Sequence, residues 1–289
     1  MILVVGATGL LGSAVCRALV ESKMAVTALV RPTADPAKVM KLEQGGAKLV
    51  KGDLKSRASL DAACKGVDAV ISTASASFSR QAGDSIQSVD LEGQLSLIDA
   101  ARAAGVRHFV FVSFPNVSVA FPLQDAKRTV EGALIASGMI YTILQPTFFM
   151  EVWLNPAVGF DAANAKAQIF GNGKAPISWI SFQDVAKFAV ASLTAPAAKN
   201  AVIKLGGPDA LTPLQVVETF EKASGRHFSI DFVPEDALRA KWSGASDPIE
   251  KSFAGLMLYY TMGDAIDMTS PLRWCTINLA SVRQLAAQV

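Results

Sequence analysis

The chain has 289 residues, 51% of them hydrophobic and 18% charged, with a formal net charge of +2. This length and hydrophobic content allow a substantial buried core and are typical of a soluble α/β protein of enzyme size. The small net charge excludes a general attraction to nucleic acid or to acidic membrane surfaces. The three cysteines and two histidines lie far apart in the sequence, which excludes a zinc-binding spacing or a disulfide framework, so no metal site is predicted.

The chain opens with a pattern of strand, glycine turn and helix. An aliphatic run at 2–5 is followed by Gly6, Gly9 and Gly12, and a helical pattern begins at once. This arrangement places a pyrophosphate on a helix N-terminus, where free backbone N–H groups and the helix dipole favour an anion. The Gly-x-x-Gly-x-x-Gly spacing could also make an ordinary turn, but the flanking strand and helix favour a nucleotide site. The residues predicted to contact the cofactor here are Gly6, Thr8, Gly9, Leu10, Leu11 and Gly12.

Strands and helices alternate over the first 146 residues. The predicted strands are 2–5, 25–30, 47–50, 68–72, 107–113 and 140–145. The predicted helices are 10–22, 35–44, 56–64, 83–104 and 124–137. The strands are nearly continuous hydrophobic runs, as expected for strands that helices cover on both sides. The pattern predicts a Rossmann-type doubly wound parallel sheet with right-handed crossovers.

The pattern loosens after Pro146. Strands are predicted at 168–170, 175–180, 201–206 and 228–233, helices at 181–193 and 213–224, and mostly helix at 234–263. We predict a dinucleotide-binding domain over 1–146 plus 181–206, and a smaller C-terminal substrate lobe over 147–180 plus 207–289. The apolar stretches are too short, or interrupted by Pro115, to span a bilayer. The first strand begins at Ile2, so no leader is expected, and reduced thiols indicate a cytoplasmic protein.

The second strand ends at Arg31, where NAD-binding domains of this kind place an acid against the ribose hydroxyls. A guanidinium suits a 2′-phosphate in charge and shape, so NADP(H) is the predicted cofactor. The alternative is an exposed arginine at a strand end. Asp53 and Leu54 follow the third strand, and Asp53 is a candidate for the adenine edge or for a helix start. Thr73 and Ala74 follow the fourth strand and are expected near the nicotinamide side.

Several of these motifs together resemble the atypical short-chain dehydrogenases/reductases, in their NmrA-like and isoflavone-reductase-like branch. The resemblance covers about the first 195 residues. The motifs that carry it are Gly6-Ala-Thr-Gly-Leu-Leu-Gly12, Arg31, Gly52-Asp53, Lys127-Arg-x-x-Glu131 and Tyr141-Thr-Ile-Leu-Gln-Pro146-Thr-Phe-Phe149. The resemblance implies an NADP-binding Rossmann domain and adds Lys127 and Pro146 to the predicted cofactor-binding residues.

The resemblance also implies a catalytic set of a Ser after the fifth strand and a Tyr-x-x-x-Lys on the next helix. Ser113 and Lys127 match, but Leu123 stands in the place of the Tyr. Leucine cannot transfer a proton, so sugar-nucleotide epimerase and ordinary alcohol dehydrogenase chemistry are not expected. In the isoflavone-reductase-like branch a lysine at this place is taken as the acid/base or cofactor-orienting group, and burial would lower its pKa. The alternatives are a surface Lys127 paired with Glu131, and a Ser113 hydroxyl that bonds only to backbone.

Aromatic residues are frequent where the smaller lobe begins. They would line a pocket for a flat or apolar substrate, or they would simply pack the lobe. These residues are Phe148, Phe149, Trp153, Phe160 and Trp179. The predicted function is an NADPH-dependent reductase that transfers hydride to an apolar or aromatic conjugated C=C, quinone or carbonyl compound. The alternatives are a non-catalytic NADP(H)-binding regulatory or redox-sensor protein of the NmrA-like type, and an assembly factor on the same fold.

Overall fold

Seven strands form one sheet in the computed structural model, which describes residues 1–77 and 81–288. In spatial order the strands are β3 (Lys48–Lys51), β2 (Val26–Val30), β1 (Ile2–Val5), β4 (Ala69–Ser72), β5 (His108–Val112), β6 (Ile140–Pro146) and β9 (Ala201–Leu205). Each neighbouring pair from β3 to β6 is parallel. The chain therefore winds outward from β1 in both directions, and the predicted Rossmann-type doubly wound fold is confirmed. In such folds ligands bind at the carboxyl ends of the strands, beside the point where the strand order reverses, here between β1 and β4.

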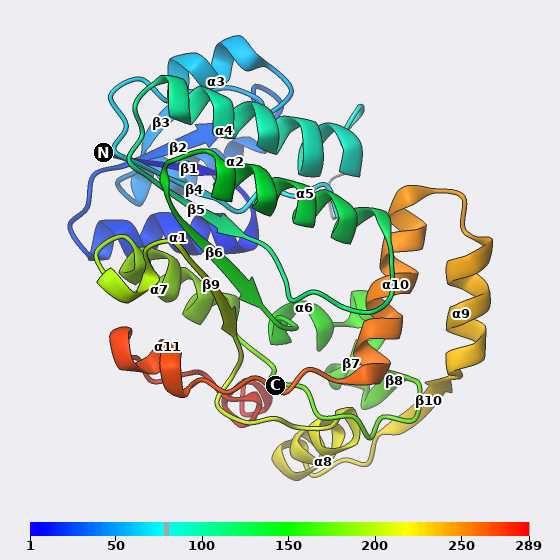
Figure 1. Ribbon diagram of the computed structural model, residues 1–289. Coiled ribbons are helices and arrows are strands. Elements are labelled where there is room, and N and C mark those ends of the chain that lie inside the picture. Colours follow the sequence, from blue (N-terminus) through cyan, green and yellow to red (C-terminus); the bar gives the residue numbers. More distant parts are fainter. Residues whose placement is uncertain (78–80, 289) are drawn as a thin grey trace. The chain divides into compact units, whose positions relative to one another are not determined.

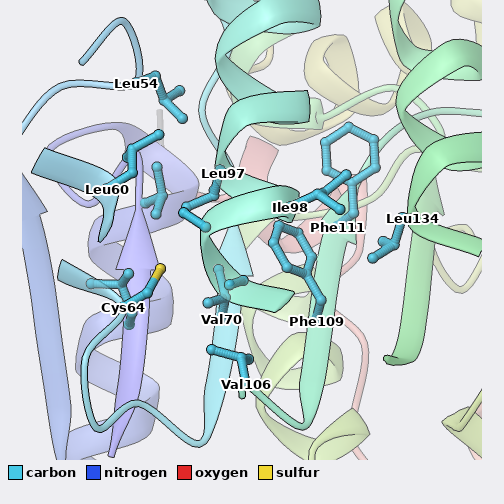
Figure 2. Packing of buried hydrophobic residues seen from close by; sticks show 14 of the residues in the cluster. Leu54, Leu60, Cys64, Val70, Leu97, Ile98, Val106, Phe109, Phe111 and Leu134 are labelled. Atoms are coloured by element: carbon cyan, nitrogen blue, oxygen red, sulfur yellow. The ribbon is translucent and has the colours of Figure 1, made fainter. Parts of the chain in front are cut away.

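Helices cover both faces of this sheet (Figure 1). The helices of this part of the chain are α1 (Leu10–Glu21), α2 (Pro36–Gln44), α3 (Arg57–Ala63), η1 (Ile86–Gly93), α4 (Gln94–Ala103), α5 (Pro122–Ala136), α7 (Phe182–Ser192) and η4 (Pro196–Ala198). Helices α3, α4 and α5 lie over one face, and α1 and α7 over the other. Figure 2 shows the core under the first group, where Phe109 and Val70 of the sheet meet Leu97 of α4 and Leu60 of α3. Apolar burial on both faces explains why the strands read as continuous hydrophobic runs.

The segment predicted as one helix at 83–104 is two elements. Its first part, η1, is a π-helix, and it continues directly into α4. The buried side of this segment carries two polar residues, Asp90 and Gln94, each with no measurable exposure. A π-helical turn changes which side chains face inward, and such turns occur frequently at functional sites. Apolar periodicity alone does not distinguish this geometry from an α-helix, which is why the prediction missed it.

Close contacts divide the chain into two compact units: residues 1–114, 123–145 and 185–203, and residues 115–122, 146–184 and 204–289. In the second unit β8 (Lys166–Phe170) pairs with β10 (Ser229–Val233) in parallel and with β7 (Phe160–Asp161) in antiparallel. Its helices are α6 (Met150–Trp153), η2 (Pro156–Val158), η3 (Ala162–Asn164), α8 (Pro213–Ser224), α9 (Glu235–Gly244), α10 (Pro248–Met262), α11 (Thr269–Trp274) and α12 (Val282–Ala286). None of the helices in the described ranges combines the length and the apolar character that crossing a bilayer requires.

The strand predicted at 175–180 is wrong. Ile177 forms single bridges to Leu211 and to Asp264, and Ile180 forms one to Phe149. Because successive residues bond to different segments, no strand within residues 1–77 and 81–288 runs alongside to build a ladder. The apolar run is buried by packing instead, and Trp179 is 1% exposed.

Candidate functional site

The glycine turn between β1 and α1 leaves no room for a side chain at Gly6 or Gly12. Gly6 has φ +83°, and a Cβ there would stand 2.7 Å from the backbone nitrogen of Ala74. A Cβ on Gly12 would lie 2.1 Å from the carbonyl oxygen of Gly6, while the N–H of Gly9 donates to the same oxygen at 2.9 Å. Among the described residues, no side chain caps the start of α1 and no acid lies in its first turn. The first N–H groups of α1 thus suit a phosphate, and the residues present fit a dinucleotide.

The end of β4 lies directly against this turn. Thr73 donates through both its N–H and its hydroxyl to the carbonyl oxygen of Val5, at 2.9 and 3.1 Å. The carbonyl oxygen of Ala74 accepts from the side chain of Gln94 at 3.1 Å, and Gln94 also accepts from Ser72 at 2.8 Å. The structure therefore brings Thr73 and Ala74 together with the glycine turn, as expected at the switch point of the sheet.

Arg31, directly after β2, forms an ion pair. Its Nη1 lies 2.5 Å from Oδ2 of Asp84, and the Nζ of Lys55 lies 2.5 Å from Oδ1 of the same carboxylate. The Asp84 side chain is 2% exposed, whereas the Arg31 and Lys55 side chains are 31% and 30% exposed. Arg31 is therefore a partly exposed arginine at the strand end that is held in an ion pair. Its predicted contact with a 2′-phosphate stays a prediction.

The loop after β3 is held by hydrogen bonds among its own residues. Asp53 Oδ1 accepts the N–H of Lys55 at 2.8 Å, and the backbone of Asp53 exchanges hydrogen bonds with the hydroxyl of Ser59. Helix α3 starts after Ser56, so Asp53 is not its N-cap residue. The Leu54 side chain is buried in the core, which leaves its backbone for any contact with a cofactor.

Lys127 lies on the buried face of α5. The residue is 5% exposed, and its Nζ lies 3.5 Å from Oδ1 of Asp90 and donates to the carbonyl oxygen of Val112 at 3.4 Å. The ammonium also lies 4.8 Å from the centre of the Phe111 ring. The alternative of a surface lysine paired with Glu131 is wrong, because Lys127 is buried and its counter-ion is Asp90.

Burial lowers the pKa of Lys127 from its ordinary value, and the attraction of Asp90 opposes this shift. The other oxygen of Asp90 accepts the N–H of Ala76 at 2.9 Å, which fixes the carboxylate in place. Because burial outweighs the attraction of Asp90, the pKa of Lys127 stays below that of a surface lysine, and its ammonium group releases a proton more readily. The acid/base role of Lys127 stays a prediction.

Ser113 is buried directly after β5, and its hydroxyl accepts from Nη2 of Arg128 at 2.7 Å. Arg128 also donates to the carbonyl oxygen of Phe114 at 2.6 Å and forms an ion pair with Glu131 at 2.8 Å. The alternative in which the Ser113 hydroxyl bonds only to backbone is wrong. Because a guanidinium can only donate, the hydroxyl keeps its own proton for another acceptor. Gln145 completes the group by donating to Glu131 at 3.0 Å.

The sequence interpretation missed Asp90, Gln94 and Arg128 as members of the site. A signal was present for the first two. Both fall on an apolar stripe at helical spacing, with the buried residues Ile86, Val89 and Leu97 on the same face. A polar residue on such a stripe is buried and must find a partner, so it indicates a site or a fixed network.

Among the described residues of the second unit, Phe148 and Phe160 pack in different groups of aromatic rings. Phe148 packs against Trp153, Trp179 and Tyr259, with ring centroids 4.9, 6.1 and 4.8 Å away. Phe160 packs elsewhere, against two rings of the same lobe, at 4.8 and 5.6 Å. These ring contacts agree with packing of the lobe, and the lining of a substrate pocket stays a prediction. Pro146, also in this unit, is buried, and its cofactor role stays a prediction.

Comparison with known proteins identifies the family. The NmrA-like family model matches residues 1–271, so the chain belongs to the NmrA-like family. The NAD(P)H azoreductase of Xenophilus azovorans is 36% identical over 228 residues, covering 78% of this chain and 74% of that protein. The photosystem II assembly factor Ycf39 of a Synechocystis strain is 33% identical, over 82% and 72% of the two chains. The solved NADPH-dependent quinone oxidoreductase QOR2 of Escherichia coli, complexed with NADPH, has a TM-score of 0.79 at 25% identity, covering 100% of this chain and 99% of that one.

Proposed function

We propose that this chain is an NADPH-dependent reductase that transfers hydride to an apolar or aromatic conjugated C=C, quinone or carbonyl compound. Its similarity to an NAD(P)H azoreductase and to an NADPH-dependent quinone oxidoreductase supports the general class of NADP-dependent oxidoreductase. By their names, these two proteins act on azo compounds and on quinones. The similarity to these two proteins supports the proposal of an apolar or aromatic acceptor.

The first unit offers what a dinucleotide needs. The glycine turn and the first N–H groups of α1 would hold the pyrophosphate, and Arg31 would hold the 2′-phosphate of the adenosine. Thr73 and Ala74, fixed against the turn, would border the cofactor on its way toward the end of β5. When bound, NADPH supplies the hydride. The protein's part is to hold it, to orient the acceptor and to provide a proton.

The buried pair of Lys127 and Asp90 is the observation that carries the reductase proposal. It lies beside the carbonyl oxygen of Val112, the last residue of β5, at the edge of the sheet where such folds bind their ligands. Lys127 would hold the proton that the reduced acceptor takes up, directly or through a water. The Ser113 hydroxyl, oriented by Arg128, would donate to an oxygen of the acceptor or of the carboxamide.

The test is turnover in NADPH oxidation assays with a panel of quinones, enones and azo dyes. The substitution Lys127→Met should lower kcat about a hundredfold while leaving NADPH affinity within about twofold, because it removes the proton donor and not the phosphate contacts. Lys65→Met, an exposed lysine after α3, is the matched control and should behave as wild type. Turnover in Lys127→Met equal to wild type would remove the residue from the mechanism.

A non-catalytic NADP(H)-binding protein, acting as a regulator or in assembly, is the second candidate. Two observations favour it: Leu123 stands where the family's usual tyrosine would be, and one relative is named as a photosystem II assembly factor. If NADPH binds with no turnover above background for any acceptor, this candidate replaces the reductase. Affinity capture of a partner in the presence and absence of NADPH would then test the regulatory role.

A further inference from the structure

One nearly buried carboxylate holds two cations from separate loops at the carboxyl ends of β2 and β3. The two oxygens of Asp84 lie 2.5 Å from Arg31 and 2.5 Å from Lys55. The segment that carries Asp84 is tied to the loop after β2 by reciprocal bonds. Thr33 donates its hydroxyl to the side chain of Gln81 at 2.6 Å, and Gln81 donates back to the carbonyl oxygen of Thr33 at 3.2 Å.

A phosphate could accept from the same two cations. Two donors, one a planar guanidinium and one an ammonium, converge on two oxygens of a single anion. Both cations follow strands on the side of the sheet where the adenosine half of a dinucleotide binds in such folds. With Asp84 between them, and Oδ2 of Asp53 4.0 Å from Lys55, little positive charge is left over for a second anion.

We propose that Lys55 is the second cation of the 2′-phosphate site, and that Asp84 is its resident carboxylate, which the 2′-phosphate displaces. This inference rests on the proposed binding of NADPH. Asp84 keeps Arg31 and Lys55 in position before the cofactor arrives. It also competes with the phosphate, so the affinity for the phosphorylated adenosine reflects an exchange of one anion for another. A ribose with a free 2′-hydroxyl has no phosphate to displace Asp84, so this exchange adds nothing to the affinity for the unphosphorylated adenosine.

Calorimetry with adenosine 2′,5′-bisphosphate and with AMP isolates the 2′-phosphate from the rest of the cofactor. Asp84→Asn should bind the bisphosphate about fivefold more tightly, because the competing charge is gone. Lys55→Ala should bind it about tenfold more weakly, the usual effect of losing one charge-assisted hydrogen bond. Neither substitution should change the affinity for AMP. NADPH titrations should follow the bisphosphate.

The controls are Asp61→Asn, which breaks the exposed pair with Arg57 at 2.8 Å, and Lys65→Ala. Both should match wild type. Lys55 is partly exposed, so its variant keeps the test valid even if Asp84→Asn unfolds. Weaker bisphosphate binding in a folded Asp84→Asn, or unchanged binding in Lys55→Ala, would overturn the proposal. If wild type binds neither NADPH nor the bisphosphate, the proposed function fails together with this inference. If wild type binds NADPH and the variants equal it, this inference alone fails.

Discussion

The substitution Asp90→Asn probes the buried ion pair most directly. Asn keeps the size of the side chain and can still accept from the N–H of Ala76, but it leaves Lys127 without its counter-ion. Lys127 is buried, so its charge cannot turn to water. It must either remain as an unpaired buried charge or lose its proton on folding. Both outcomes destabilise the folded state.

The size of the effect follows from the geometry. At the observed separation of 3.5 Å, and with an effective dielectric constant of about 20, the two charges attract by about 5 kcal/mol. If Lys127 instead loses its proton on folding, the loss of free energy of unfolding has an upper limit of similar size. The ordinary lysine pKa lies about 3.4 pH units above pH 7, and each unit corresponds to about 1.4 kcal/mol. The free energy of unfolding should therefore fall by about 3–5 kcal/mol at pH 7.

Urea denaturation followed by circular dichroism measures this loss. Tryptophan fluorescence would report only on the second unit, which contains all four tryptophans: Trp153, Trp179, Trp242 and Trp274. The matched control is Asp99→Asn on α4, whose pair with Arg102 has the same 3.5 Å separation but is exposed on both sides. The free energy of unfolding of Asp99→Asn should fall by less than about 1 kcal/mol, because solvent screens an exposed pair.

The double variant with Lys127→Met decides whether the pair is the cause. Once Lys127 is gone, Asp90→Asn leaves no charge behind, so its cost should be at least about 2 kcal/mol smaller than in the wild-type background. A loss below about 1 kcal/mol in Asp90→Asn, or costs that simply add in the double variant, would refute this account of the buried pair.

Three further outcomes follow. Because burial lowers the pKa of Lys127 in the folded state, the unfolded state binds more protons at alkaline pH. Wild-type stability should then rise as pH increases toward about 10, and this rise should be absent in denaturation curves of the double variant with Asp90→Asn. Gly12→Ala should weaken NADPH binding by at least about tenfold in calorimetry, since its methyl group would stand 2.1 Å from the oxygen of Gly6. Burial lowers the pKa of His108 from 6.5 to about 4, so melting temperatures should fall as pH drops through that window, and less so in His108→Gln.

The opening turn and the alternation of strands and helices were predictable because they depend on local chemistry. Three glycines at three-residue steps between an aliphatic run and an apolar helix permit few other conformations, and the structure shows why: each position faces backbone atoms. The alternation of hydrophobic runs with helical patterns likewise predicted the parallel sheet, because strands that are buried on both faces must be hydrophobic throughout. The family resemblance follows from the same segments.

The pairing of charged side chains was decided only in three dimensions. The spacing of four residues allowed a pair between Lys127 and Glu131. In the structure, the partner of Lys127 is Asp90 on η1, and Glu131 pairs with Arg128 instead. Arg31 likewise pairs with an acid 53 positions later in the chain. Local periodicity tells which face a side chain occupies, but a buried charge takes whichever counter-ion the packing of distant elements brings within reach. Which counter-ion pairs with a buried charge depends on the sheet order and on the π-helical turn, and no single segment of the sequence determines either of them.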